Sequence, residues 1–402
     1  MNESVDRERL VTGYSGRLFL ATSLGWLFIQ MGRQLLPPLL PNIIADLQIT
    51  STQAGFALTL MWGIYALCQY PSGRLSDRLS RKTLLVSGLG LLIGGFLVVW
   101  GTVSYSMFLI GVAVVGLGAG LYPTAARALV SDLFVRRRGQ AFGVHTAAGD
   151  LGNASAAGLA VVAVAFATWN AAFLPMVGIF AGLLLVFHLW SREAYVFETV
   201  HLGVRSTGRR LFGNDRLRWS LLAYVLFAFT WQSTTGFLPT FLQFEKGFSV
   251  GLASTGFAVL FLVGMGVKPI AGVLGDRFKR TTVAASALLL GLVGLTGVLI
   301  VENTTLLFAS IGVFAAGLMS FPPVMQAYLM DVFPDESMGG DLGGMRTVYI
   351  GIGSLGPTYV GFVAGIASYT AAFAGLVGCL LVSAGLIVAY EFRNRDQSSS
   401  IG

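Results

Sequence analysis

Charged residues are scarce in this sequence. Asp, Glu, Lys and Arg together make up 11% of its 402 residues, whereas hydrophobic residues make up 55% and the mean hydropathy is +0.75. A soluble domain carries about 25% charged residues, and a soluble chain this apolar could not cover its own surface with polar groups. The composition therefore excludes an ordinary soluble domain and predicts an integral membrane protein.

Cysteine and histidine are also rare. The two cysteines, Cys68 and Cys379, lie inside apolar runs, so we expect neither to form a disulfide or to bind a metal. The three histidines lack the spacing of metal ligands, and no nucleophile–base arrangement points to an enzyme. We therefore expect no catalytic residue, no metal and no cofactor.

Twelve apolar runs are long enough to cross a membrane, because a spanning helix needs roughly 20 mostly apolar residues. Residues 191–216, the longest polar segment, separate them into two halves of six. The runs are 18–41, 53–72, 83–101, 105–131, 140–166, 170–190, 217–242, 250–272, 282–301, 305–331, 342–366 and 370–390. We predict an all-α membrane protein with six-helix bundles at 18–190 and 217–390 and polar tails at 1–17 and 391–402.

The basic residues predict the orientation of the chain. Of the 26 lysines and arginines, 21 fall on the side of both termini, and one, Lys246, falls on the opposite side. Because basic flanks stay in the cytoplasm, we expect cytoplasmic termini and a plasma (inner) membrane location. The net charge is +7, and the basic residues that produce it flank apolar spans. We therefore expect this protein to have the lipid bilayer as its partner and not nucleic acid.

The two halves repeat one another at a shift of 199 residues. The matching pairs include Gly73 and Gly272, Asp77 and Asp276, Arg81 and Arg280, Pro123 and Pro322, and Asp132 and Asp331. Each half is therefore predicted to be a copy of one six-helix unit. Such repeats are typical of secondary transporters, whose substrate site lies near the membrane midplane between the halves.

The repeated charged stretch resembles a family signature. GRLSDRLSRK, residues 73–82, is similar to the loop G-x-L-x-D-R-x-G-R-K of the major facilitator superfamily, with Ser80 in place of the second glycine. The second copy, GVLGDRFKRT at 272–281, has Lys279 there and Thr281 in place of lysine. The resemblance in topology and repeat covers nearly the whole chain. It implies a secondary transporter that works by rocker-switch alternating access.

In that family, the acid and the arginines of this loop form a latch between the two halves at the cytoplasmic face. The alternative is that these residues merely orient the spans. The resemblance assigns the latch to Asp77, Arg81 and Asp132 in the first half, and the repeat assigns its mirror to Asp276, Arg280 and Asp331 in the second. Arg78 and Arg277, in the same stretches, are further candidates for coupling or gating.

Few ionisable residues lie inside the predicted spans. An ionised side chain at the centre of a membrane helix costs about 2.5–3.5 kcal/mol, so each one is a candidate functional residue. Arg346 lies one turn into its predicted span, and we expect it to orient the chain more than to bind substrate. The candidates away from the span ends are Arg33, Arg127, His145, Asp150, Lys268 and Arg346.

Arg33 is the strongest candidate for a substrate contact. It lies near the middle of the first span, on the same helix face as Gln30, and its planar guanidinium group suits a carboxylate or phosphate. The alternative is an internal ion pair with Asp150. The remaining predicted substrate-binding residues are Gln34, Arg127, Trp231, Gln232, Lys268 and Gln326.

Asp150 is the one acid deep in a predicted span. It is expected to couple or gate transport, as an ion-pair partner of a cavity arginine, as a proton carrier or as a ligand for a cationic substrate. His145 lies in the same span and has a pKa near neutrality in its free form. A lone histidine in a span is more often a packed polar residue.

The excess of basic over acidic residues in the spans predicts a small anionic substrate. We expect it to be moved by exchange or together with protons, and we expect the protein to function as a monomer. The main alternative is a proton-coupled exporter of lipophilic or cationic drugs. That family branch carries an early arginine in its fourth helix, where this chain has Val112, and an acid in its first helix, where this chain has Arg33. A membrane sensor that does not transport is a further alternative.

Overall fold

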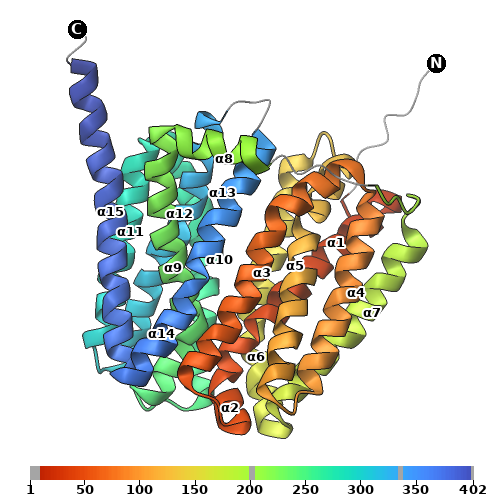
Figure 1. Ribbon diagram of the computed structural model, residues 1–402, viewed down its shortest axis with the longest axis horizontal. Helices are drawn as coiled ribbons and strands as arrows, with labels where there is room; N and C mark the ends of the chain where they lie inside the picture. Colours follow the sequence, from red (N-terminus) through yellow and green to blue (C-terminus); the bar gives the residue numbers. More distant parts are fainter. Residues whose placement is uncertain (1–9, 199–203, 334–337, 400–402) are drawn as a thin grey trace.

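The computed structural model describes residues 10–198, 204–333 and 338–399, and within these ranges its regular secondary structure is helical (Figure 1). This confirms the predicted all-α class. The helices are α1 (Gly13–Gln34), α2 (Leu36–Leu47), α3 (Ser51–Arg78), α4 (Arg81–Trp100), α5 (Tyr105–Leu133), α6 (Arg138–Phe166), the 3-10 helix η1 (Trp169–Phe173), α7 (Leu174–Trp190), α8 (Val204–Gly213), α9 (Asp215–Phe244), α10 (Val250–Arg277), α11 (Arg280–Ile300), α12 (Thr304–Val332), α13 (Met338–Gly353), α14 (Leu355–Ile366) and α15 (Tyr369–Ser399).

Ten segments of the described chain are long and apolar enough to cross a membrane, by length and composition. The two predicted spans outside this set are 18–41, which corresponds to α1 and α2, and 53–72, which lies in α3. Both run alongside the other helices of their bundle (Figure 1). The mean hydropathy of 18–41 is lowered by polar residues such as Gln30 and Arg33, and these are residues expected to bind substrate.

The helices form two bundles side by side. Helices α1–α7 make up one bundle, and α9–α15 make up the other (right and left in Figure 1). Helix α3 packs against α13 and α14 across the boundary, and α6 packs against α10. Helix α1 begins and α15 ends at one end of the molecule, where α8 also lies. We call this end the termini end, and the other the opposite end.

Side-chain caps explain where several helices begin. The Thr50 hydroxyl accepts a hydrogen bond from the Gln53 backbone, and the Gln53 side chain accepts one from the Thr50 backbone. This capping box satisfies two amide groups that the first turn of α3 leaves without helical partners. The same kind of side-chain cap precedes α4, α5, α9, α10 and α12, at Ser80, Ser104, Asn214, Ser249 and Asn303.

The first predicted span is interrupted, as its prolines lead one to expect. Helix α1 ends at Gln34 and α2 begins at Leu36, just before Pro37 and Pro38. Proline has no amide hydrogen to donate and its ring crowds the preceding turn. Helix α2 is itself followed by Gln48, which adopts a positive φ of 50°.

Several predicted boundaries were wrong at the polar ends of the spans. The charged stretch 73–82 is not a loop, because α3 continues through Arg78 and α4 begins at Arg81. Residues 191–216 contain α8, and α15 continues into the predicted tail as far as Ser399. Hydropathy shows where the apolar part of a helix ends. The helix itself continues into polar residues, because its backbone hydrogen bonds do not depend on apolar side chains. The first nine residues of the predicted N-terminal tail lie outside the described residues.

The two bundles are tightly joined at the opposite end. The Ser51 hydroxyl lies 2.7 Å from the Tyr369 hydroxyl, and the Thr59 hydroxyl donates to the Ser354 carbonyl at 2.5 Å. A Cβ atom added to Gly55 would lie 2.3 Å from the carbonyl oxygen of Pro357. Backbone contact this close permits only glycine there, and it closes the passage between α3 and α14 at this end.

Candidate substrate-binding site

Arg33 lies on α1 at the boundary between the bundles, and its side chain is 2% exposed. Its guanidinium carbon lies 4.6 Å from the ring centre of Trp62 and 4.4 Å from that of Tyr65, both on α3. Its Nη2 donates to the Gln30 side chain. Within the described part of the chain, its Nε and Nη1 find no acceptor. The aromatic rings therefore hold the guanidinium group by cation–π contact without neutralising it.

Two further arginines join this site. Electrostatic interactions link the buried Tyr65 side chain to Arg33, to Arg127 on α5 and to Arg346 on α13. Arg127 donates from Nε to the Pro123 carbonyl at 3.2 Å. We call Arg33, Arg127 and Arg346 the arginine cluster. Two of its members come from the first bundle and the third comes from the second.

The arginine cluster has no acidic partner among the residues that the structure describes. None of its three guanidinium groups has a described carboxylate oxygen within 4.0 Å. Like charges in a poorly solvated region repel one another strongly. The cluster therefore has a positive charge that an anionic ligand would offset.

Arg346 lies deeper in its helix than the predicted span implied. Helix α13 begins at Met338, four residues before the predicted start of the span, so Arg346 lies two turns into the helix. Because α13 packs against α3, this places Arg346 next to Tyr65. Trp62 and Tyr65 were not predicted. Their spacing of three residues in one span is a signal, but aromatic residues in spans are more often packing residues.

Asp150 and Lys268 form an ion pair between the bundles. The Lys268 Nζ lies 2.6 Å from the Asp150 Oδ1, and Asp150, on α6, is 7% exposed. Lys268, on α10, was predicted to bind substrate, and an ion pair of Asp150 with Arg33 was an alternative to substrate contact by Arg33. The structure instead pairs Asp150 with Lys268, because α6 and α10 cross at the boundary between the bundles.

The other predicted site residues have varied surroundings. His145 is buried and stacks on Trp26 at 5.9 Å between ring centres. Trp231 packs edge-on against Phe261 in its own bundle. Gln34 on α1 and Gln232 on α9 are buried, and the Gln232 side chain donates to the Ile350 carbonyl at 3.1 Å. Gln326 on α12 is exposed.

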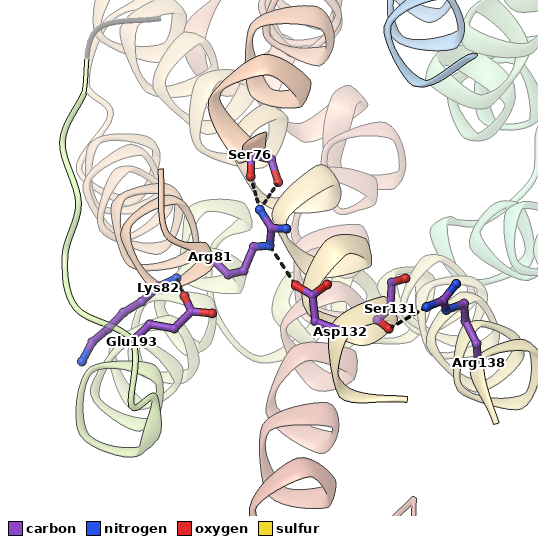
Figure 2. Close-up of polar contacts among 7 residues, drawn as sticks. All are labelled: Ser76, Arg81, Lys82, Ser131, Asp132, Arg138 and Glu193. Atoms are coloured by element: carbon purple, nitrogen blue, oxygen red, sulfur yellow. Dashed lines mark hydrogen bonds and ion pairs between the residues drawn. The ribbon is translucent and has the colours of Figure 1, made fainter. Parts of the chain in front are cut away.

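The charged motif forms ion pairs within each bundle, and Figure 2 shows the one in the first bundle. Arg81 donates from Nε to the Asp132 carboxylate at 3.1 Å, and its Nη1 contacts Ser76. Arg280 pairs with Asp331 in the second bundle in the same way. The sequence analysis expected contacts between the halves. The partners are instead neighbouring helices of one bundle, α4 with α5 and α11 with α12.

The remaining motif residues make fewer contacts. Asp276 lies 3.9 Å from Arg280, within about one turn, and Arg78 and Arg277 are exposed. Asp77 lies in α3, but its side chain is outside the described part of the structure. At the termini end, the motif therefore supplies the partly exposed pair Arg81–Asp132 to the first bundle and the pairs Arg280–Asp331 and Lys279–Glu391 to the second.

Helix α8 contacts both bundles at the termini end, which sequence reasoning missed. The Thr207 hydroxyl lies 3.2 Å from the Tyr70 hydroxyl of α3. Arg210 binds Asp341 of α13 through Nη2 at 2.6 Å and through Nε at 3.0 Å. Asp341 is 1% exposed. In the sequence, these residues fall in or beside polar segments that were counted only for their charge.

The family follows from comparison with known proteins. The Major Facilitator Superfamily model matches residues 22–320 and, in a second match, residues 262–401. The chain belongs to this family, as its motif and repeat predicted. It is therefore a multi-pass membrane protein and a transporter, not an enzyme.

Individual relatives are more distant. The chain is 28% identical to a probable sulfoacetate transporter of Cupriavidus necator over 356 residues, which cover 80% of this chain and 81% of the relative. It is 24% identical to a multidrug resistance protein of Klebsiella pneumoniae over 285 residues, or 69% and 71% of the two chains. A bacterial homolog of the human lysosomal transporter Spinster, in an inward-facing and occupied conformation, shares the fold with a TM-score of 0.79 at 16% identity, over 94% of this chain and 97% of that chain.

Proposed function

We propose that this transporter carries a small anionic solute, which binds at the arginine cluster and crosses the membrane by rocker-switch alternating access. One observation carries the proposal: three guanidinium groups interact electrostatically with the same buried side chain, Tyr65, and no described carboxylate lies within 4.0 Å of them. Guanidinium groups bind carboxylates, sulfonates and phosphates through paired hydrogen bonds. A bound anion would supply the negative charge that the protein does not.

The comparison with relatives supports the same sign of charge. The relative from Cupriavidus necator is named a probable sulfoacetate transporter, and sulfoacetate carries a sulfonate and a carboxylate. The polar residues beside Arg33, Gln30 and Gln34, extend the proposed site along α1.

The ion pair of Asp150 with Lys268 is proposed as a gate. It joins the two bundles directly, so it must break when they separate at the termini end, and protonation of Asp150 is one way to break it. Transport would then proceed by exchange or with protons. Both termini would lie in the cytoplasm and the protein in the plasma (inner) membrane. A single chain would be the functional unit.

The alternative, export of lipophilic cations, receives less support from the site. A cationic drug needs an acidic partner in the membrane, and the deep acid Asp150 is already paired with Lys268. Three arginines beside the same boundary would repel a cation. Because the Klebsiella pneumoniae relative is a multidrug resistance protein, the test below includes lipophilic cations.

The test is thermal stabilisation of the purified protein by panels of small anions, neutral sugars and lipophilic cations. A ligand that binds only the folded state at about 100 times its Kd stabilises it by about 2.7 kcal/mol. We expect one class of anion to raise the melting temperature of the wild type. We expect Arg33→Gln to abolish that rise.

The matched control is Arg218→Gln, since Arg218 is exposed at the start of α9 and pairs with Asp215 far from the arginine cluster. It should keep the full response to the anion. Stabilisation by lipophilic cations alone, lost on Asp150→Asn, would replace the proposal with drug export.

A further inference from the structure

We propose that the solute is a short dianion, with one anionic group bound by Arg33 of the first bundle and the other bound by Arg346 of the second. This inference rests on the proposed function. It extends that function from the sign of the solute's charge to the number and placement of its charged groups.

The origin of the three charges is the first step. Arg33 lies on α1 and Arg127 on α5, whereas Arg346 lies on α13, across the boundary. Arg346 interacts electrostatically with both of the other arginines. These like charges repel across the boundary. A solute with one anionic group offsets one positive charge, but a solute with two offsets a charge on each bundle and links the bundles.

Free donors on both sides are the second step. Within the described chain, the buried Nε and Nη1 of Arg33 have no acceptor. The same holds in the second bundle for the Nε of Arg346 and the hydroxyl of its neighbour Thr347. Buried donors without partners are rare in folded proteins. Their presence in both bundles indicates two acceptor groups, each with its own set of donors.

The third step concerns the length of the solute. The side chain of Tyr65 interacts with both Arg33 and Arg346. The two guanidinium groups are therefore within reach of a single tyrosine. We therefore expect a short spacer between the two anionic groups, as in a short dicarboxylate or a short carboxylate that carries a terminal sulfonate.

The experiment compares each dianion with its monoamide, which has nearly the same shape and one charge fewer. The probes are malonate and malonamate, succinate and succinamate, and a sulfonate-bearing carboxylate with its carboxamide. Their Kd values are measured by calorimetry on the full-length protein. We expect the wild type to bind at least one dianion about tenfold or more tightly than its monoamide.

The variant Arg346→Gln should remove this preference, because it should weaken the binding of the dianion and leave the binding of the monoamide unchanged. Arg33→Gln should weaken the binding of both probes. Arg346→Lys keeps the charge, so it should keep part of the preference, and it serves if Arg346→Gln does not fold. Equal affinities for dianion and monoamide would overturn the inference but leave an anion transporter. An equal loss of affinity for both probes in Arg346→Gln would have the same two consequences. Failure of every anion to bind would overturn the proposed function as well.

Discussion

The arginine cluster and the ion pair of Asp150 with Lys268 make an instructive contrast. Both bring charged side chains from the two bundles to the boundary between them. In the ion pair, the protein supplies the opposite charge at 2.6 Å. In the arginine cluster, within the described residues, it does not. Because an uncompensated charge in a membrane helix is costly, the difference separates charges that the protein neutralises itself from charges that a bound anion would neutralise.

The largest effect on stability is expected at the paired charges. Lys268→Met leaves the carboxylate of Asp150 buried without a partner, and breaking a buried pair in this way costs about 3–5 kcal/mol. The double variant Asp150→Asn, Lys268→Met should recover most of that loss. Chemical or thermal unfolding in detergent measures both. Equal stability of the single variant and the wild type would remove the contrast.

The arginine cluster should respond in the opposite way. Arg127→Gln removes one of three mutually repelling charges, so the ligand-free protein should keep or gain stability. Loss of a charged hydrogen-bond donor should weaken anion binding by about 1.5–3 kcal/mol. Melting temperatures with and without the anion measure the two effects together. A destabilised ligand-free protein with unchanged anion affinity would show Arg127 to be structural.

Helix α8 provides an intermediate case of a partly exposed arginine on a buried acid. Arg210→Gln removes the charged hydrogen bonds from Arg210 to Asp341, which is 1% exposed, and we expect a loss of about 1–3 kcal/mol. Arg218→Gln, which breaks an exposed pair with Asp215, is the control and should change stability far less. Similar losses in the two variants would mean that α8 does not hold the bundles.

The smallest effect is expected at the motif. The Asp132 side chain of the Arg81–Asp132 pair is 56% exposed, and exposed ion pairs contribute about 0.2–1 kcal/mol. A double-mutant cycle with Arg81→Gln and Asp132→Asn should give a coupling energy in that range. A coupling above it would place the pair among the compensated charges that hold the fold. A transport defect without a stability change would support a gating role.

Much of the architecture could be predicted because its signals are local. Hydropathy marks the spans, proline at 37 and 38 marks the break between α1 and α2, and the shift of 199 residues reveals the repeat. The cost of charge in a membrane helix also makes Arg33 and Asp150 stand out in the sequence. Each of these inferences needs only neighbouring residues or a comparison of the chain with itself.

The partners of those charges were decided by the tertiary structure. Asp150 pairs with Lys268, which is 118 residues away, Arg346 joins Tyr65 from the other bundle, and the motif arginines pair inside one bundle. Sequence determined that this is a two-bundle membrane transporter with costly buried charges. Which of them the protein neutralises depends on how distant helices cross, and helix crossing is set by packing along their whole length, not by the residues around each charge.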